Sequence, residues 1–226
     1  GPAGVQKTLV VKRIRPEYAD DPRFVNMFIN EARIGVHLAH PNIVQVFELG
    51  RAAGTWFIAM EYVHGRDLTR ILRRLRADDE RLPDALSVHV VAELLRGLHH
   101  AHSRTDPEGE PLGLIHQDVS PHNVLLGFDG EVKLLDFGIA RAVNADDDSG
   151  TPAGRGKFAY SSPESAAGGQ VDHRSDLYSA GVTLWELLAG RRPYHGLDPA
   201  TKMARIREGD LPSLAEVRDD LDPALV

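Results

Sequence analysis

The stretch of residues 116–138, HQDVSPHNVLLGFDGEVKLLDFG, limits what this chain can fold into more than any other part of the sequence. Two short apolar runs flank an Asp-Gly turn, which is a strong signal for a β-hairpin. Asp118 and Asn123 precede the hairpin and Asp136 follows it, so all three should lie at one end. Oxygen ligands gathered in this way suit Mg²⁺, which takes one or two carboxylates together with substrate phosphates.

A single hairpin flanked by carboxylates is common, but the full spacing D-x4-N, hairpin, D-F-G is far more specific. It resembles the catalytic and metal-binding loops of eukaryotic-type (Hanks-type) protein kinases, and the chain looks closest to the bacterial serine/threonine kinases of that superfamily. The resemblance implies that Asp118 orients the acceptor hydroxyl and takes its proton, while Asn123 and Asp136 hold Mg²⁺. It also implies ATP as the phosphoryl donor.

A β-rich run at residues 8–14, TLVVKRI, contains Lys12. Taken alone, it reads as a strand with an outward-facing Lys. It resembles the V-A-I-K strand of the kinases, whose Lys grips the α- and β-phosphates. In the helical pattern that follows, Glu31 lies on or beside the apolar face, where an unpaired carboxylate is costly. The resemblance implies a Lys12–Glu31 ion pair, and the alternative is a Glu31 side chain in water at the rim.

Residues 61–65, EYVHG, interrupt the β pattern of the preceding strands and resemble the hinge between the two lobes of a kinase. The resemblance implies that the backbone at Glu61 and Val63 hydrogen-bonds adenine. It also implies that Val10 lies above the base and that Leu125 forms the apolar floor below it.

Two further acidic residues, Asp67 and Asp176, each begin a helical pattern and allow two interpretations. In the kinase frame Asp67 meets the ribose hydroxyls, and Asp176 hydrogen-bonds the backbone of the catalytic loop. As ordinary structural residues, Asp67 would cap its helix and Asp176 would interact favourably with the helix dipole. Both roles are compatible for Asp67.

Three histidines, His99, His100 and His102, close the apolar helix pattern of residues 86–102. Spacings of one and two residues spread their side chains around a helix. We therefore favour solvated or capping histidines over a metal site.

The sequence departs from the kinase pattern in several places. The Gly-rich loop before the Lys strand is missing, as are the last helices of the large lobe, so Glu164 should lack the Arg with which it would pair. Gln117 replaces the Arg of H-R-D and cannot make that residue's bidentate contact with a phosphate. Ser120 stands where a Lys is usual and Lys157 where a Thr is usual. We hypothesise that the two changes compensate and keep one cation and one hydroxyl beside the catalytic Asp.

Composition narrows the function classes further. The net charge of −7 argues against nucleic acid as the main partner, and the absence of cysteine excludes disulfides and thiolate chemistry. No apolar run reaches about 18 residues, so we expect no membrane segment in this chain. These properties fit a cytoplasmic protein.

The sequence thus predicts an α+β, bilobal, protein-kinase-like fold with a small β-rich N lobe, here truncated, and a larger, mainly α-helical C lobe. We place the N lobe and hinge at residues 1–63 and the C lobe at residues 64–226. The expected function is Mg-ATP-dependent phosphorylation of serine or threonine in proteins, in bacterial signalling. Two alternatives stay open, a pseudokinase or nucleotide-binding scaffold and a small-molecule phosphotransferase. The segments SPE at residues 162–164 and GRRPY at residues 190–194 favour the protein kinase over the latter.

Overall fold

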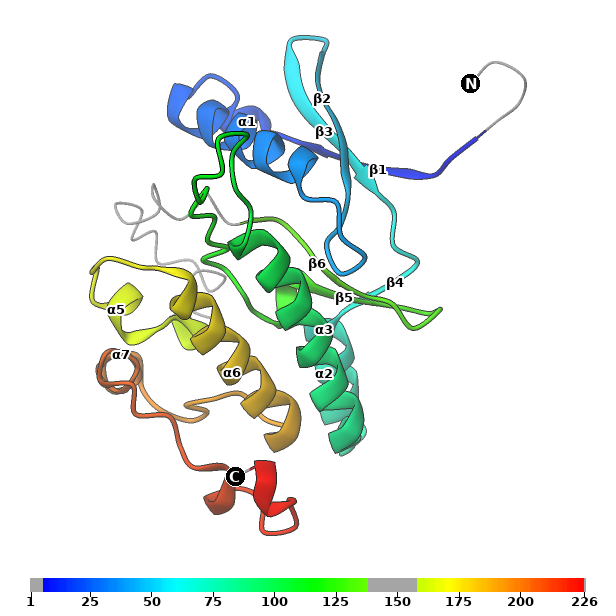
Figure 1. Cartoon of the computed structure of the whole chain (residues 1–226). Helices are drawn as coiled ribbons and strands as arrows, with labels where there is room; N and C mark the ends of the chain where they lie inside the picture. Colours follow the sequence, from blue (N-terminus) through cyan, green and yellow to red (C-terminus); the bar gives the residue numbers. More distant parts are fainter. Residues whose placement is uncertain (1–5, 138–157, 226) are drawn as a thin grey trace.

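The computed structural model describes residues 6–137 and 158–225. Figure 1 shows two bodies, a smaller one built of three strands and a helix above a larger, mainly helical one. Within the described residues, no helix is long and apolar enough to cross a bilayer.

The smaller body is an antiparallel sheet with strand order β1-β3-β2, covered by one helix. Its elements are β1 (Leu9–Arg13), α1 (Pro22–His37), β2 (Val46–Ala52) and β3 (Thr55–Glu61). Helix α1 begins where the sequence indicates, because the Asp21 side chain accepts a hydrogen bond from the Arg23 amide at 2.9 Å and Pro22 opens the first turn. Phe28 and Ala32 on α1 are buried in the same apolar cluster as Ile58 and Met60 of β3.

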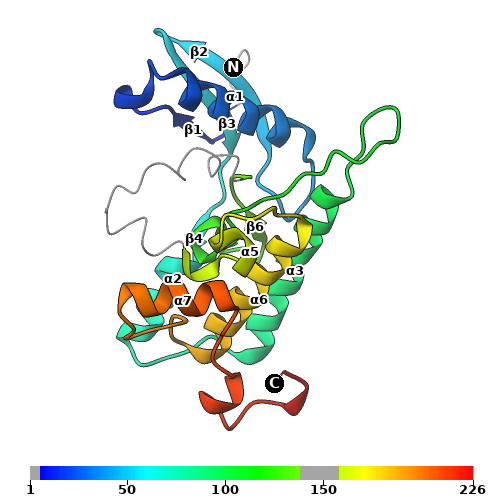
Figure 2. The ribbon, with the colours of Figure 1, turned by 90° about the vertical axis from the view of Figure 1, so that its left-hand side faces the viewer.

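Among the described residues, the larger body combines a second small sheet, of order β4-β5-β6, with five α-helices. The strands are β4 (Gly65–Asp67), β5 (Val124–Gly127) and β6 (Val132–Leu134), and the helices are α2 (Leu68–Ala77), α3 (Asp84–His102), α5 (Pro163–Ala166), α6 (His173–Ala189) and α7 (Pro199–Glu208). Figure 2 shows α2, α6 and α7 in the lower part of this body. The predicted hairpin is present as β5 and β6, with its turn at Gly130 in a left-handed conformation, φ 92°.

The largest apolar cluster lies between α3, α6 and the β4-β5-β6 sheet. Apolar residues at helical spacing predicted both helices, at positions 88, 91, 94, 95 and 98 on α3 and 177, 180, 181, 184, 187 and 188 on α6. The assignment to the buried face was wrong for Val88 and Leu95 of α3 and Leu177 of α6, which are exposed. On α3 the buried stripe runs through Ser87, Val90, Val91, Leu94, Gly97, Leu98 and Ala101. The sequence pattern missed part of this stripe because Ser87 is polar and Gly97 and Ala101 are small, and the pattern was read from large apolar residues.

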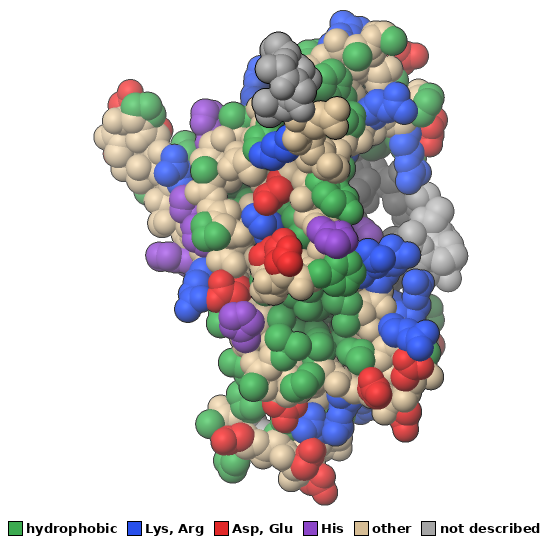
Figure 3. All heavy atoms as spheres, turned by 90° about the vertical axis from the view of Figure 1, so that its right-hand side faces the viewer, with side chains coloured by type: hydrophobic (Ala, Val, Ile, Leu, Met, Phe, Trp, Pro, Cys, Tyr) green, Lys and Arg blue, Asp and Glu red, His purple; other side chains and the backbone are tan. Residues whose placement is uncertain are grey.

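Helix α6 ends at Gly190, in a left-handed conformation with φ 68°, as a glycine directly after an apolar helix pattern predicts. Its first turns bury polar residues instead of apolar ones, namely Ser175, Asp176 and Ser179. On the face shown in Figure 3, Lys and Arg side chains are interspersed with Asp and Glu, and hydrophobic side chains gather in the lower half.

Candidate active site

The residues just before the hairpin are joined by the side chain of Asn123. Its Nδ2 donates to the backbone carbonyl of Asp118 at 2.8 Å and to the Asp118 carboxylate at 2.9 Å. Asn123 is buried in the short 3₁₀ turn Pro121–Asn123, whereas Asp118 is partly exposed. Because Asp118 takes both amide hydrogens, the amide oxygen of Asn123 is the atom left to meet a cation.

Lys12 connects the two bodies. Its ammonium lies 2.6 Å from the carboxylate of Glu31 on α1 and 2.8 Å from that of Asp136, the residue that follows the hairpin. The Lys12–Glu31 ion pair is thus present, and the Glu31 side chain is only 17% exposed, which rules out the alternative of a rim residue in water. Three residues from distant parts of the chain therefore meet at one point, facing the end of the hairpin.

Burial shapes the ionisation of this group. Burial removes water from the Glu31 carboxyl and raises its pKa to about 7. The nearby Asp136 carboxylate also raises this pKa, and the Lys12 ammonium lowers it by less. For Lys12, burial alone would lower the pKa, but Asp136 and Glu31 together raise it above its ordinary value. The Lys12 ammonium is therefore held firmly in its charged form.

Asp176, near the start of α6, holds the backbone of the segment that precedes Asp118. Its carboxylate accepts hydrogen bonds from the amide of His116 at 2.7 Å and from that of Gln117 at 2.8 Å, as the sequence predicted. Gln117 has φ 61° and Asp136 has φ 36°, so both adopt a left-handed conformation that costs a non-glycine residue free energy. Strain of this kind persists where surrounding contacts impose it, and the Asp176 bonds do so at Gln117.

His102 is a part of the site that the sequence analysis did not identify. Its Nε2 lies 2.8 Å from Oδ2 of Asp176, and both side chains are nearly buried. The expectation of solvated or capping histidines was wrong for His102, because its side chain contacts a buried carboxylate, whereas its neighbour His99 is exposed. A cue was available in the sequence, because His102 is spaced from Ala101 and Leu98 like a residue at the edge of the buried stripe.

The residues expected around the nucleotide lie near one another at the junction of the two bodies. Val10 lies opposite Met60 in the sheet and, two residues from Lys12, on the same face of β1. Leu125 packs against the cluster that contains Met60 and Val63. The Asp67 carboxylate accepts a hydrogen bond from the Arg70 amide at 2.9 Å, which confirms its predicted capping role.

Glu61, another residue expected at the nucleotide, forms an ion pair through its side chain. Its backbone belongs to the last residue of β3, while its side chain forms an ion pair with Lys133 of β6. The β pattern thus extends one residue further than the sequence indicated. The side chain of Glu61 therefore has a role separate from that expected of its backbone.

The donor set at the hairpin end fits Mg²⁺ by its chemistry. Asn123 contributes an amide oxygen and Asp136 a carboxylate, both hard oxygen ligands. In the part of the chain that the structure describes, no three His, Cys, Asp or Glu side chains are gathered so that they could hold a metal by themselves. A Mg²⁺ held here would thus need phosphate oxygens as additional ligands.

Some expectations concern residues outside the described ranges or residues with other partners. Lys157, proposed to replace the missing Lys at Ser120, lies outside the described residues, and Ser120 itself is buried. Glu164, expected to lack its Arg, accepts a hydrogen bond from the Ser175 hydroxyl.

Comparison with known proteins places this geometry in context. Residues 3–223 match the family described as "Protein kinase domain". The chain is 40% identical over its whole length to the "Tyrosine-protein kinase MasK" of Myxococcus xanthus, covering 35% of that protein. It is 37% identical over 92% of its length to the "Serine/threonine-protein kinase PknB" of Mycobacterium leprae, covering 32% of it, and 36% identical over 97% of its length to the "Serine/threonine-protein kinase PknL" of Mycobacterium tuberculosis, covering 52% of it.

Solved structures agree with the sequence relatives. The Mycobacterium tuberculosis PknI kinase domain aligns with a TM-score of 0.67 and 31% identity, over 97% of this chain and 75% of that one. This confirms the predicted α+β kinase-like fold. The chain spans about a third to a half of the length of the curated relatives described above.

Proposed function

Because this chain belongs to the protein kinase domain family, we propose that it binds Mg-ATP and transfers the γ-phosphoryl group to serine or threonine hydroxyls of proteins in bacterial signalling. The observation that supports this most directly is the position of Lys12, 2.6 Å from Glu31 and 2.8 Å from Asp136. A cation fixed by two carboxylates at the mouth of the hairpin is suited to bind phosphate oxygens in a defined place. The proposal includes the division into an N lobe and hinge, residues 1–63, and a C lobe, residues 64–226.

Each of the residues at the hairpin end has a role in this proposal. Asp118 orients the acceptor hydroxyl and takes its proton, and Asn123 keeps the Asp118 carboxylate in place through its amide. Lys12, braced by Glu31, binds the α- and β-phosphates. Mg²⁺, held by Asn123 and Asp136 together with the phosphates, would neutralise the charge on the transferring group.

The adenosine part of ATP would lie between the two bodies. The hinge backbone at Glu61 and Val63 hydrogen-bonds the adenine, and Val10 and Leu125 enclose its faces. Asp67 reaches the ribose hydroxyls. We place this activity in the cytoplasm, where ATP is available. We propose proteins as the partners, because a net charge of −7 argues against nucleic acid as the main partner.

Acceptor specificity is the least constrained element, because the relatives carry both tyrosine-protein and serine/threonine-protein kinase names. The test is transfer from γ-labelled ATP to a generic protein acceptor, followed by phosphoamino acid analysis. It is run on this chain and on a longer form that includes the flanking segments. Phosphoserine or phosphothreonine supports the proposal, and phosphotyrosine alone would overturn its acceptor class.

The two alternatives give different outcomes in the same assay. A pseudokinase would bind nucleotide without transfer, and a small-molecule phosphotransferase would label an aminoglycoside but not the protein. The matched control is Asp118→Asn, which should lower the rate of labelling by roughly 10²- to 10⁴-fold. Labelling at the wild-type rate in this variant would mean that Asp118 is not the base.

A further inference from the structure

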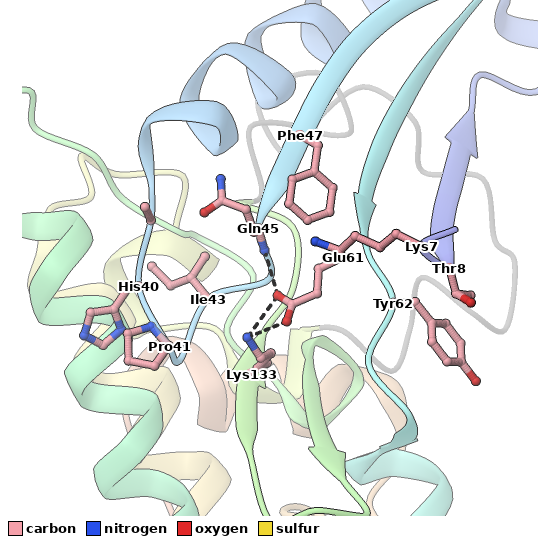
Figure 4. Close-up of a pocket in the computed structure, with 11 residues that line it drawn as sticks. Lys7, Thr8, His40, Pro41, Ile43, Gln45, Phe47, Glu61, Tyr62 and Lys133 are labelled. Atoms are coloured by element: carbon pink, nitrogen blue, oxygen red, sulfur yellow. Dashed lines mark hydrogen bonds and ion pairs between the residues drawn. The ribbon is translucent and has the colours of Figure 1, made fainter. Parts of the chain in front are cut away.

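A second ion pair joins the two bodies on the side of the hinge away from Lys12. The Lys133 ammonium lies 2.8 Å from Oε1 and 2.9 Å from Oε2 of Glu61, so it bonds both carboxylate oxygens. The amide of Gln45 donates to Oε2 of the same carboxylate at 3.1 Å. Figure 4 shows this contact network, in which Glu61 points away from β3 toward Lys133. The side chains of Lys133 and Glu61 are only 13% and 26% exposed, so water screens the pair weakly.

This pair and the Lys12–Asp136 pair connect the same two parts of the chain, residues 133–136 and the paired strands β1 and β3. Lys133 and Asp136 are three residues apart at the end of the hairpin. In the sheet, Glu61 lies opposite Leu9, which is three residues from Lys12 on β1. Residues 133–136 of the larger body thus hold the adjacent strands β3 and β1 at two points with the same spacing along the chain.

Backbone hydrogen bonds make the hinge-side anchor rigid. Leu134 donates to the carbonyl of Asn42 at 2.8 Å and accepts from the amide of Val44 at 2.9 Å, so the connection between α1 and β2 is fixed to β6. The Glu61 amide donates to the carbonyl of Gln45 at 2.9 Å, in the same connection. Glu61 is therefore tied to β6 through its side chain directly and through its backbone by way of residues 42–45.

We infer that Lys133 and Glu61 form a positioning pair, which sets the hinge backbone and the distance between Lys12 and Asp136 for nucleotide binding. Neither side chain is assigned a contact with the reacting atoms. The inference rests on the proposed function, because it assigns the hinge and Lys12 to ATP. The Lys133–Glu61 pair is formed in the same structure as the contacts of Lys12 with Glu31 and Asp136. We therefore expect loss of the Lys133–Glu61 pair to lower activity.

The surroundings of the pair allow it to be tested by substitution. It borders an open hollow of about 470 Å³, which is also lined by Gln45, Phe47 and Tyr62. Water can enter this hollow and hydrate whichever partner remains. A variant that lacks the ion pair should therefore fold, and loss of positioning can be separated from loss of the fold.

The first measurement is Mg-ATP affinity by titration. Lys133→Met should raise the Kd about tenfold, the change that corresponds to about 1.4 kcal/mol. Lys133→Arg keeps the cation and should retain most of the affinity. The control is Asp78→Asn, which removes an exposed ion pair with Arg74 on α2 and should leave the Kd unchanged. In turnover assays the KM for ATP should rise more than kcat falls.

The second measurement, amide hydrogen exchange without nucleotide, tests the pair even if the proposed function is wrong. Lys133→Met should accelerate exchange at residues 42–46 and 61–65, and Asp78→Asn should not. The inference would be overturned by unchanged exchange in Lys133→Met. It would also be overturned if this variant bound Mg-ATP as tightly as the wild type or turned over faster. A wild-type protein that binds no Mg-ATP would refute the proposed function, and exchange would still decide whether the pair fixes the hinge.

Discussion

The imidazole Nε2 of His102 lies 2.8 Å from Oδ2 of Asp176, the same oxygen that accepts the His116 amide at 2.7 Å. The C-terminus of α3 and the N-terminus of α6 are thereby joined at the carboxylate that supports the catalytic stretch. Asp176 is 1% exposed, so its charge is stable only because donors surround it. His102 is one of these donors, together with two backbone amides.

We predict that His102→Ala destabilises the protein and loosens residues 116–118. The change removes one donor from a buried carboxylate, which should cost about 1–3 kcal/mol in the free energy of unfolding. The control is His99→Ala on the same turn of α3, where an exposed side chain should contribute less than about 0.5 kcal/mol. Denaturant unfolding of the two variants measures the difference, and equal stabilities would remove His102 from the network.

For the chemical step, we predict that Asp118→Asn abolishes phosphoryl transfer and leaves ATP binding nearly unchanged. An Asn at this position can still accept the Asn123 hydrogen bond that now reaches the carboxylate at 2.9 Å, so the local geometry should be retained. Loss of the general base should lower turnover by roughly 10²- to 10⁴-fold. Single-turnover assays beside an ATP isotherm measure both quantities. Full turnover in the variant would mean that Asp118 is not the base.

The metal site can be tested with Asp136→Asn. Asn tolerates the left-handed conformation at this position, φ 36°, better than Ala does, so backbone strain does not confound the result. Loss of the carboxylate should abolish the gain in ATP affinity that Mg²⁺ provides. Isotherms with and without Mg²⁺ measure this gain, with Asp129→Asn in the exposed hairpin turn as the control. An equal Mg²⁺ dependence in Asp136→Asn and the wild type would exclude Asp136 as a ligand.

Stability should respond in opposite directions to two Gly→Ala changes. At Gly65 in β4, a Cβ would lie 2.0 Å from the backbone oxygen of Leu126, so the strands must separate. We expect Gly65→Ala to cost about 1–3 kcal/mol, as overpacking does elsewhere. At Gly181 in α6 a Cβ meets no atom within 4 Å, so Gly181→Ala should stabilise the helix by about 0.5–1 kcal/mol. Thermal unfolding of both variants is the measurement, and a neutral Gly65→Ala would show that β4 and β5 can separate at little cost.

Much of this protein could be predicted from its sequence, because the signals are local. The Asp-Gly turn and its flanking apolar runs specify the hairpin, which places Asp118, Asn123 and Asp136 near one another. Asp21 and Gly190 mark helix ends through contacts within a few residues. The Lys12–Glu31 pair followed from resemblance to a family, since no periodicity connects residues 19 positions apart.

Other features depended on the tertiary structure alone. The pairing of His102 with Asp176 and of Lys133 with Glu61 joins residues 74 and 72 positions apart, and the neighbouring histidines of α3 look alike in the sequence. Asp176 at the start of α6 can be buried because the amides of His116 and Gln117 donate to it, which no hydrophobic pattern indicates. Local conformational preferences act within a few residues, whereas the packing of distant segments determines which residues become the partners of buried charges.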